Sequence, residues 1–293
     1  VYDPPLKVLA KTIESVVSQE FREWEWVIVD DCSQDSRVRD LLRTAAARHR
    51  RIKLIERADN GHIVKATNDA LSRATGTFIA LLDHDDVLTS DALARVSEVL
   101  AEDVDYVYTD EVFISANGEF VARFPKPDWS PERLRGQMYT GHLSVIRRAL
   151  ANRLGGFREG FDGSQDYDLV LRVAEAARRV VHVPLPLYQW RQVEGSVASS
   201  SEAKPYAYEA AERAIAEHLQ RVGIDGEVVG IPGHRGHYHI RRRLDPQLRV
   251  SVIIPTAFHE GLGGGEKRAF VVEALQSLFR TTRHENLEIV IVH

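Results

Sequence analysis

The amino-acid sequence predicts an α/β fold with a mixed, mostly parallel sheet that carries helices on both of its faces. Short apolar runs alternate with stretches of helical periodicity at intervals of about 25 residues through the first part of the chain. Several of these runs end in carboxylates, which marks the sheet edge where open α/β folds bind their ligands. The composition, 44% hydrophobic and 28% charged over 293 residues, suits one large domain or two of ordinary size.

The first elements follow from capping and periodicity. Asp3-Pro4-Pro5 opens a helix with Asp3 as its N-cap, and the apolar positions of Leu6–Val17 repeat at helical spacing. Trp26–Val29 is a buried strand, and Ser33 or Asp35 caps the helix after it. The pattern then predicts a strand over 52–55, a helix over 63–74 and a strand over 77–82 that is buried on both faces.

After residue 110 the parallel pattern breaks. Asn117-Gly118 stands between two alternating segments and is a strong signal for a two-residue hairpin. The proline-containing stretch Val180–Leu187 suits an edge strand, because proline cannot donate to a ladder. The other predicted elements are strands over 105–109 and 142–146, a helix that ends at Gly155-Gly156, a helix that starts near Asp166 and a helix over 206–222.

The end of the chain repeats its beginning. Trp24–Asp30 aligns with Leu287–His293, and Ile13–Val17 aligns with Leu275–Phe279. We therefore expect a domain over residues 1–225, a β-rich linker over 226–248, and the incomplete opening β-α-β unit of a second domain of the same type over 249–293. This division implies a longer tandem parent protein. The alternative is that Val250–Pro255 fills a vacant strand position in the first sheet.

Three carboxylates follow the apolar run at 77–82. Asp83, Asp85 and Asp86 stand within four residues of one another, with His84 among them. Acids this close repel one another unless a positive group lies between them, and a hard divalent cation with phosphate oxygens is the natural partner. The alternative is a charged loop in which Asp86 caps the next helix.

The totals exclude several classes of function. A net charge of −5 gives no basic surface for nucleic acid. The single cysteine, Cys32, rules out a disulfide framework and favours a reducing compartment. No apolar stretch approaches the roughly 18 residues of a membrane span, although peripheral membrane contact stays open.

Taken together, the motifs resemble those of the inverting family 2 glycosyltransferases, which have the GT-A (Rossmann-like) fold. The resemblance covers about residues 1–199 and includes sequence versions found in bacterial surface-polysaccharide transferases, which are often tandem. The motifs that carry it are Tyr2-Asp3-Pro4-Pro5, Asp30-Asp31, Asp83-His84-Asp85, Tyr108-Thr109-Asp110-Glu111, Gly163–Leu169 with Asp166, and Tyr188-Gln189-Trp190-Arg191.

The resemblance implies roles for the carboxylates. Asp31 contacts the nucleobase beside Asp30, Asp83 lies at the ribose, and Asp85 binds the Mn²⁺ or Mg²⁺ that bridges the diphosphate, with Asp83 near the same ion. Asp166 corresponds to the general base, and its alternative reading is a helix N-cap. Gln189 stands where the family often has a histidine, which weakens any metal-binding role at that position.

Further candidates surround this group. Tyr2, Lys65 and Asn68 are expected on the nucleotide side, although Lys65 is more readily explained as an exposed lysine. Five residues are expected to contact the acceptor or the sugar: Asp110, Glu111, His142, Trp190 and Arg191. Each has a structural alternative, such as a solvated turn for the two acids or a capped edge strand for Trp190 and Arg191.

The predicted function is inverting transfer of a sugar from a nucleotide-sugar donor to a glycan or lipid-linked glycan acceptor. The reaction needs a divalent metal and belongs to bacterial cell-surface polysaccharide synthesis, in the cytoplasm or at the inner face of the membrane. The alternatives are a degenerate transferase domain that binds glycan or acts as a scaffold, and a haloacid dehalogenase-like phosphatase with Asp83 as its nucleophile.

Overall fold

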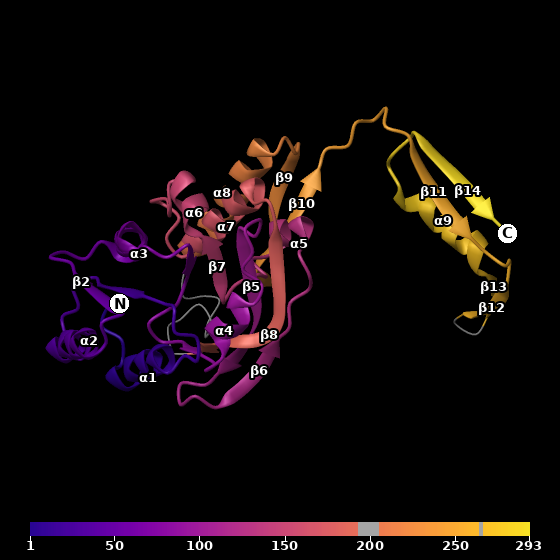
Figure 1. Cartoon of the computed structure of the whole chain (residues 1–293). Coiled ribbons are helices and arrows are strands. Elements are labelled where there is room, and N and C mark those ends of the chain that lie inside the picture. The colour runs from indigo at the N-terminus through magenta and orange to yellow at the C-terminus, as the bar shows by residue number, and fades with distance from the viewer. Residues whose placement is uncertain (193–204, 264–265) are drawn as a thin grey trace. The chain divides into compact units, whose positions relative to one another are not determined.

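The computed structural model describes residues 1–192, 205–263 and 266–293, and the chain forms two compact units (Figure 1). The first unit is Val1–Arg241 and the second is Arg242–His293. In the part of the chain that is described, no helix combines the length and the apolar character that crossing a bilayer requires.

The first unit opens with two parallel strands and three helices. These elements are α1 (Leu6–Val17), β1 (Trp26–Asp30), α2 (Ser36–Arg48), β2 (Ile52–Glu56) and α3 (His62–Arg73). Strand β1 pairs with β2 in parallel, with Trp26 opposite Ile52. Leu9 of α1, Ile28 of β1 and Leu42 of α2 share one buried cluster. The apolar faces that the helical periodicity predicts therefore pack against these strands.

The expected N-cap of the first helix is wrong. Helix α1 follows Pro5 without a side-chain cap. Asp3 instead has a positive φ of 41°, and its carboxylate accepts hydrogen bonds from the backbone N–H groups of Gln34 and Asp35. Asp35 caps α2 as the sequence predicts, since its side chain accepts from the N–H of Arg37. Asp3 therefore joins the start of the chain to the loop after β1.

A six-stranded sheet forms the centre of the first unit. Its strand order is β3 (Phe78–Ala80), β7 (Ser144–Arg147), β5 (Tyr106–Ile114), β8 (Val180–Arg191) and β4 (Val87–Leu88), with β6 (Phe120–Phe124) paired to β5. Strands β5 and β8 are parallel, whereas the other described pairs of this sheet are antiparallel. The mixed α/β class is confirmed, and the sheet is less parallel than the sequence pattern predicts.

Two strand environments differ from the prediction. The apolar run at 77–82 forms only the three-residue strand β3, because the chain soon turns into the acidic loop. Strand β3 lies at the end of the sheet and is partly exposed, so the prediction that it is buried on both faces is wrong. The proline-containing strand β8 lies inside the sheet between β5 and β4, not at an edge. Proline cannot donate a ladder hydrogen bond, and a β-bulge accommodates it here. The register shifts between Thr109, which pairs with Val183, and Asp110, which pairs with Pro186.

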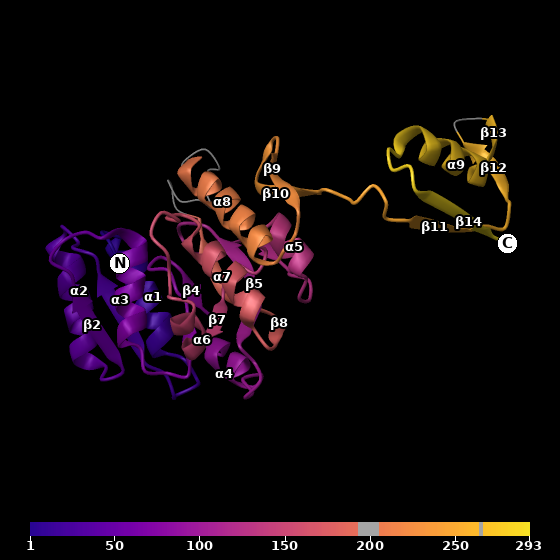
Figure 2. The same cartoon turned by 90° about the horizontal axis from the view of Figure 1, so that it is seen from above.

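Helices cover both faces of this sheet (Figure 2). Tyr106 and Tyr108 of β5 join one buried cluster, and Val107 between them joins the other, as the alternation of a strand requires. The first cluster receives side chains from α3, α5 (Pro131–Gly136), α6 (Arg148–Arg153), α7 (Gln165–Ala176) and α8 (Pro205–Arg221). The second receives side chains from α1 and α4 (Ala92–Ser97).

The stretch expected as a linker begins with a hairpin of the first unit. Strands β9 (Gly226–Ile231) and β10 (His234–Arg242) pair with each other, and Tyr238 of β10 is buried in the cluster that α7 and α8 build. The Tyr238 hydroxyl donates to the carbonyl of Tyr208 in α8 at 3.3 Å. Residues 226–241 therefore belong to the first unit, because they cover one end of its core.

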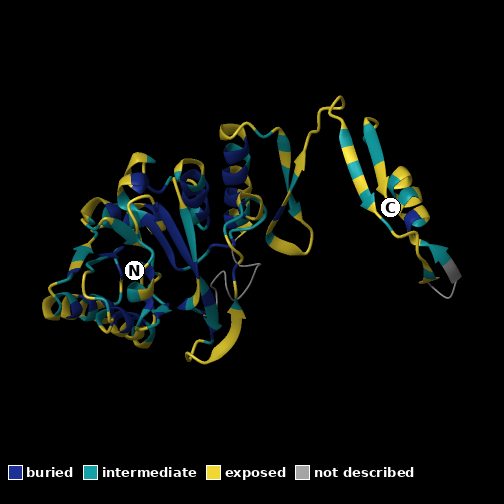
Figure 3. Cartoon of the chain, turned by 45° about the vertical axis from the view of Figure 1, so that its right-hand side comes forward, coloured by how far each residue is buried: buried dark blue, intermediate teal, exposed yellow. Residues whose placement is uncertain are grey.

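The second unit consists of β11 (Val250–Pro255), β12 (Glu260–Gly263), β13 (Glu266–Ala269), α9 (Phe270–Thr281) and β14 (Leu287–Val292). Strand β11 pairs in parallel with β14, with Val252 opposite Ile289 and Ile254 opposite Ile291. This is the pairing that the sequence analysis expects of a separate sheet. Figure 3 shows that much of this unit is of intermediate or high exposure, and Phe279 and Ile253 keep 69% and 65% of their surface accessible.

Two backbone features occur in both units. The amino group of Val1 donates to the carbonyl of Val29 at 2.7 Å, and the N–H of Thr256 donates to the carbonyl of Val292 at 2.8 Å. Two residues further on, Asp3 and Phe258 both have positive φ, 41° and 52°. Val29 and Val292 are the positions that the sequence repeat aligns. The repeat therefore extends from sequence to backbone conformation.

Candidate active site

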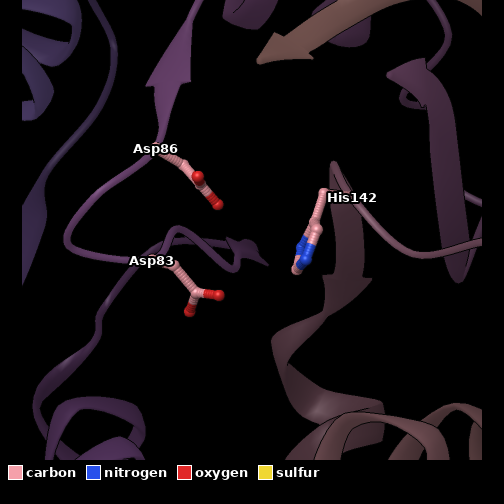
Figure 4. A group of neighbouring side chains, drawn as sticks. All are labelled: Asp83, Asp86 and His142. Atoms are coloured by element: carbon pink, nitrogen blue, oxygen red, sulfur yellow. The ribbon is translucent and has the colours of Figure 1, made fainter. Parts of the chain in front are cut away.

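Asp83, Asp86 and His142 converge on one point in the first unit (Figure 4). A ligand atom from each side chain lies within 4.8 Å of the others. The two acids come from the loop between β3 and β4, and the histidine comes from the segment before β7. Asp83 is exposed, Asp86 is buried and His142 is partly buried, so the group lies at the boundary between the core and solvent.

Asp86 is fixed by the end of β8. Its carboxylate accepts a hydrogen bond from the Tyr188 hydroxyl and another, of 2.7 Å, from the N–H of Arg191. Burial, followed by the nearby charges of Asp83 and Asp85, raises the pKa of Asp86 to about 9. The loop thus holds a carboxyl group that prefers to be neutral unless positive charge is brought to it.

Asp85 lies in the same loop but outside the converging group. It is partly buried, and burial raises the pKa of its carboxyl while the neighbouring charge of His84 opposes this effect. Its backbone carbonyl accepts from Nε of Arg191 at 2.8 Å. Where the sequence analysis expects Asp83 and Asp85 at the metal, the structure brings Asp86 and His142 to Asp83.

The His142 ring is clamped between aromatic side chains. It stacks on Tyr188, with ring centroids 4.6 Å apart, and meets Trp190 edge to face at 5.1 Å. The Tyr188 hydroxyl donates to the Asp86 carboxylate and accepts from the N–H of Asp83 at 3.3 Å, so one tyrosine contacts all three members of the converging group. The expected site residues His142 and Trp190 are therefore neighbours of the acidic loop.

Asp166 lies in the first turn of α7. Ser164 occupies the N-cap position, and the Asp166 carboxylate accepts from the N–H of Tyr167 at 2.8 Å. Burial raises the pKa of Asp166, His142 lowers it, and Asp83 raises it again. These interactions place the carboxylate in the electrostatic field of the same group, and Asp166 is not the N-cap.

The first acid pair lies at the carboxyl end of β1. Asp31 is buried, accepts from the N–H of Gly61 at 2.8 Å and pairs with Nε of Arg57 at 2.9 Å. Asp30, also buried, accepts from the N–H of Ser33 at 3.3 Å. Sequence reasoning missed Arg57, because a single arginine after a strand gives no signal of its own.

Lys65 and Asn68 of α3 have different surroundings. Lys65 is largely exposed and lines a small pocket of about 140 Å³ with Gly61, His62 and Glu159. The Asn68 amide is occupied by the backbone of Phe157, donating to its carbonyl at 2.8 Å and accepting from its N–H at 2.9 Å. Asn68 therefore ties α3 to the segment before α7. Tyr2, the other residue expected on this side, is 47% exposed.

The remaining candidates belong to internal networks. Arg191 is buried, and its guanidinium donates to the backbone carbonyls of Asp85, Ser115 and Ala116. This arrangement braces the acidic loop against the β5–β6 hairpin, at a residue that was expected to contact the acceptor or the sugar.

Asp110 and Glu111 meet a buried lysine that the sequence analysis missed. The carboxylate of Asp110 accepts from the N–H of Lys126 at 2.9 Å, and that of Glu111 accepts from Nζ of Lys126 at 3.0 Å. A lone lysine between two prolines reads as a surface residue, so no local signal identifies it.

Comparisons with known proteins give the context of this geometry. The family model "Glycosyl transferase family 2" matches residues 2–155. Over its full length the chain is 40% identical to the uncharacterized protein y4gI of Sinorhizobium fredii and 35% identical to the O-antigen biosynthesis protein RfbC of Myxococcus xanthus. The chain spans only 32% and 22% of the length of these two relatives.

Two solved structures share the fold. Staphylococcus aureus TarS 1–349 in complex with UDP-GlcNAc has a TM-score of 0.59 at 23% identity, over 73% of this chain and 63% of that one. The mannosyltransferase PcManGT of Pyrobaculum calidifontis, in complex with GDP-Man and Mn²⁺, has a TM-score of 0.53 at 20% identity, over 76% and 61%. The family model covers more than half of the sequence, and the chain belongs to glycosyl transferase family 2.

Proposed function

We propose that the first unit transfers a sugar from a nucleotide-sugar donor to a hydroxyl of a glycan or lipid-linked glycan, with inversion at the anomeric carbon and with a divalent cation. The observation that carries this proposal is the convergence of Asp83, Asp86 and His142 within 4.8 Å, in a chain of glycosyl transferase family 2. Asp166 in the field of the same group supports it.

The donor set fits a hard or borderline divalent cation. Carboxylate oxygens suit Mg²⁺ and Mn²⁺, and an imidazole nitrogen favours the transition metal of the two. Asp83 and Asp85 remain the ligands that the family resemblance implies, and His142 and Asp86 are the groups that the structure adds. When bound, the cation supplies positive charge against which the leaving diphosphate is neutralised.

Asp166 is our candidate for the general base. The carboxylate would take the proton of the acceptor hydroxyl while the acceptor oxygen bonds to the anomeric carbon and the bond to the diphosphate breaks. A pKa raised by burial strengthens the carboxylate as a base. The nucleotide of the donor would bind to residues from the first part of the chain. These are the buried Asp30 and Asp31, Arg57, and the exposed Tyr2 and Lys65.

The names of the relatives support a proposal for the setting. One relative is named for O-antigen biosynthesis, and the putative glycosyltransferase EpsE of Bacillus subtilis is 31% identical over 64% of this chain. We propose bacterial surface-polysaccharide synthesis, in the cytoplasm or at the inner membrane face. The backbone repeat supports the further proposal that the second unit is the opening part of a second domain of the same family.

A donor screen tests the function. Thermal shift measurements with Mn²⁺ and UDP-, GDP- and dTDP-sugars should show stabilisation by one nucleotide class only when the metal is present. The Asp166→Asn variant should keep this stabilisation and lose transfer by about 10²–10⁴-fold, because the amide keeps the shape but cannot accept a proton. Transfer at the wild-type rate by this variant would remove Asp166 from the mechanism, and phosphate release without a sugar donor would contradict the proposed reaction.

A further inference from the structure

A buried lysine, Lys126, bonds to β5 and to the segment before β7. Lys126 follows β6, and its side chain is completely buried against Glu111 of β5. The Nζ group donates to Oε2 of Glu111 at 3.0 Å, to the carbonyl of Thr140 at 2.8 Å and to the carbonyl of His142. An ammonium group has three donors, and here each of them has an acceptor.

The same pair holds the backbone of His142 on both sides. Oε2 of Glu111 accepts from the N–H of His142 at 2.9 Å, while Lys126 binds its carbonyl. The preceding residue, Gly141, has a φ of 34°, and a Cβ there would lie 3.0 Å from Oε2 of Glu111. The close approach of the segment to the ion pair therefore depends on the missing side chain.

The ring of His142 receives its own constraints from Tyr188 and Trp190, as described above. With its backbone fixed by the Lys126–Glu111 pair and its ring packed against β8, this side chain has little freedom to leave Asp83 and Asp86. The ion pair therefore bonds to the backbone of His142, while a ligand atom of its ring lies within 4.8 Å of those of the two acids.

A buried ion pair is an expensive way to join strands. Desolvation of two charges often exceeds their mutual attraction, and apolar residues of similar volume commonly give equal or greater stability. Here the pair provides directed hydrogen bonds to both backbone groups of His142 and to the carbonyl of Thr140. Apolar side chains would not supply these bonds. This favours a role in geometry over a role in stability.

We propose that Lys126 and Glu111 are positioning residues that hold the His142 ring against Asp83 and Asp86 and so set the affinity of this loop for its cation. The inference rests on the proposed function for the presence of the cation, but the placement of the ring is independent of it.

The test uses the full chain with both charges removed, in the double variant Lys126→Met/Glu111→Gln. The ring resonance of His142, assigned in ¹³C-labelled protein by its loss in His142→Gln, reads the placement of the ring without metal. Calorimetric titration with Mn²⁺ alone and with Mn²⁺ plus UDP reads the cation site. We expect a changed His142 resonance and Mn²⁺ affinity reduced by about 10–100-fold, the range found for residues that support metal ligands.

A matched control separates positioning from general destabilisation. Asp105 is a buried carboxylate at the start of β5 that pairs with Arg178 at 2.8 Å, and neither residue contacts His142. The variant Asp105→Asn/Arg178→Met should lower the melting temperature but leave the His142 resonance and the Mn²⁺ affinity unchanged. If the first double variant does not fold, Glu111→Gln alone keeps the shape and one acceptor oxygen, and it should give smaller changes of the same sign.

A folded Lys126→Met/Glu111→Gln protein with an unchanged His142 resonance and wild-type Mn²⁺ affinity would overturn the inference and leave the pair a structural link. Wild-type protein that binds no Mn²⁺ would contradict the proposed cation site. In that case the His142 resonance alone still decides whether the pair positions the ring.

Discussion

The three aspartates of the acidic loop, Asp83, Asp85 and Asp86, differ in burial and in bonding partners, although the sequence alone does not distinguish them. Asp83 is exposed and free to meet a ligand, whereas Asp86 is buried and bonded to Tyr188 and to the N–H of Arg191. Asp85 lies between them with its carbonyl held by Arg191. Residues of β8 therefore hold the backbone and one carboxylate of this loop in place.

Substitution of the acids should separate these tasks. Asp85→Ala should abolish metal-dependent nucleotide binding and Asp83→Asn should weaken it by at least about tenfold, because a hard cation loses a carboxylate ligand. Calorimetric titration of UDP and GDP with Mn²⁺ measures both effects. The control is Asp91→Asn, which changes a nearby carboxylate that bonds to Thr89 and Arg95. Unchanged affinity in Asp85→Ala would exclude Asp85 as a ligand.

Glu25 gives a prediction for the pH dependence of stability. Burial opposes its ionisation, but hydrogen bonds from Lys53, Thr75 and Gly76 outweigh burial and lower its pKa to about 2. A carboxylate with a depressed pKa stabilises the fold above its unfolded pKa, near 4.3, and this contribution is lost as pH falls toward about 2. Because 22% of the side chain is exposed, we expect about 1–2 kcal/mol at neutral pH.

Glu25→Gln should therefore lower the free energy of unfolding at pH 7, with the difference from wild type shrinking between pH 4 and pH 2. Urea unfolding at several pH values measures this. A difference that stays constant across the range would show that the charge of Glu25 has no part in it.

At the scale of elements, the site depends on how α3, α7 and β8 are fixed relative to one another. The bulge between β5 and β8 lets the prolines of β8 lie inside the sheet. Strand β8 then continues to Tyr188 and Arg191, and Tyr188 bonds to Asp86 of the acidic loop. Asn68 fixes α3 to Phe157, and Gly156 approaches the Asn68 amide so closely that a Cβ would lie 2.6 Å from Oδ1. These contacts set the framework on which α7 presents Asp166.

Asn68→Ala should destabilise the first unit by about 2 kcal/mol, because it removes two hydrogen bonds and leaves two backbone groups of Phe157 without them. The matched control is Thr67→Ala on the same helix, whose hydroxyl donates to the carbonyl of Ile63 one turn earlier. Urea unfolding should show a clear loss for the first variant and about 0.5 kcal/mol or less for the second. Equal effects would mean that the Asn68–Phe157 contact adds nothing.

At the scale of the whole molecule, the chain contains two units of very different completeness. The first has three buried clusters and contributes every residue of the candidate active site. The second has the order β11, α9 and β14, and Val271, 9% exposed, is the only buried hydrophobic residue among those described in it. A core this small contributes little stability of its own.

A protein ending at Arg241 should therefore keep the main thermal transition of the full chain within a few degrees, because the cores of the first unit are intact. Its affinity for the nucleotide and Mn²⁺ should match that of the full chain. Differential scanning calorimetry and the same titrations check both. Failure of the shortened protein to fold would show that the first unit depends on the second.

The amino-acid sequence alone was sufficient to predict the class of fold, the order of most elements and the acids that end the strands. These features are local or periodic: Asp35 caps a helix through neighbouring atoms alone, and Asn117-Gly118 marks a hairpin. The two-residue turn predicted there is wrong, because β5 ends at Ile114, β6 begins at Phe120, and the N–H of Ser115 bonds to the carbonyl of Glu119 across a longer loop. The resemblance of the motifs was sufficient to name the family.

The tertiary structure decided what those residues contact. It placed β8 inside the sheet, occupied Arg191 and Asn68 with backbone groups, and brought His142, Lys126 and Arg57 to the acids from distant parts of the chain. A buried charge is stabilised by partners that can come from any segment, so its role depends on packing and not on sequence spacing. For this reason the acids and some of their neighbours, such as His142 and Arg191, were visible in the sequence, but the contacts that orient the acids were not.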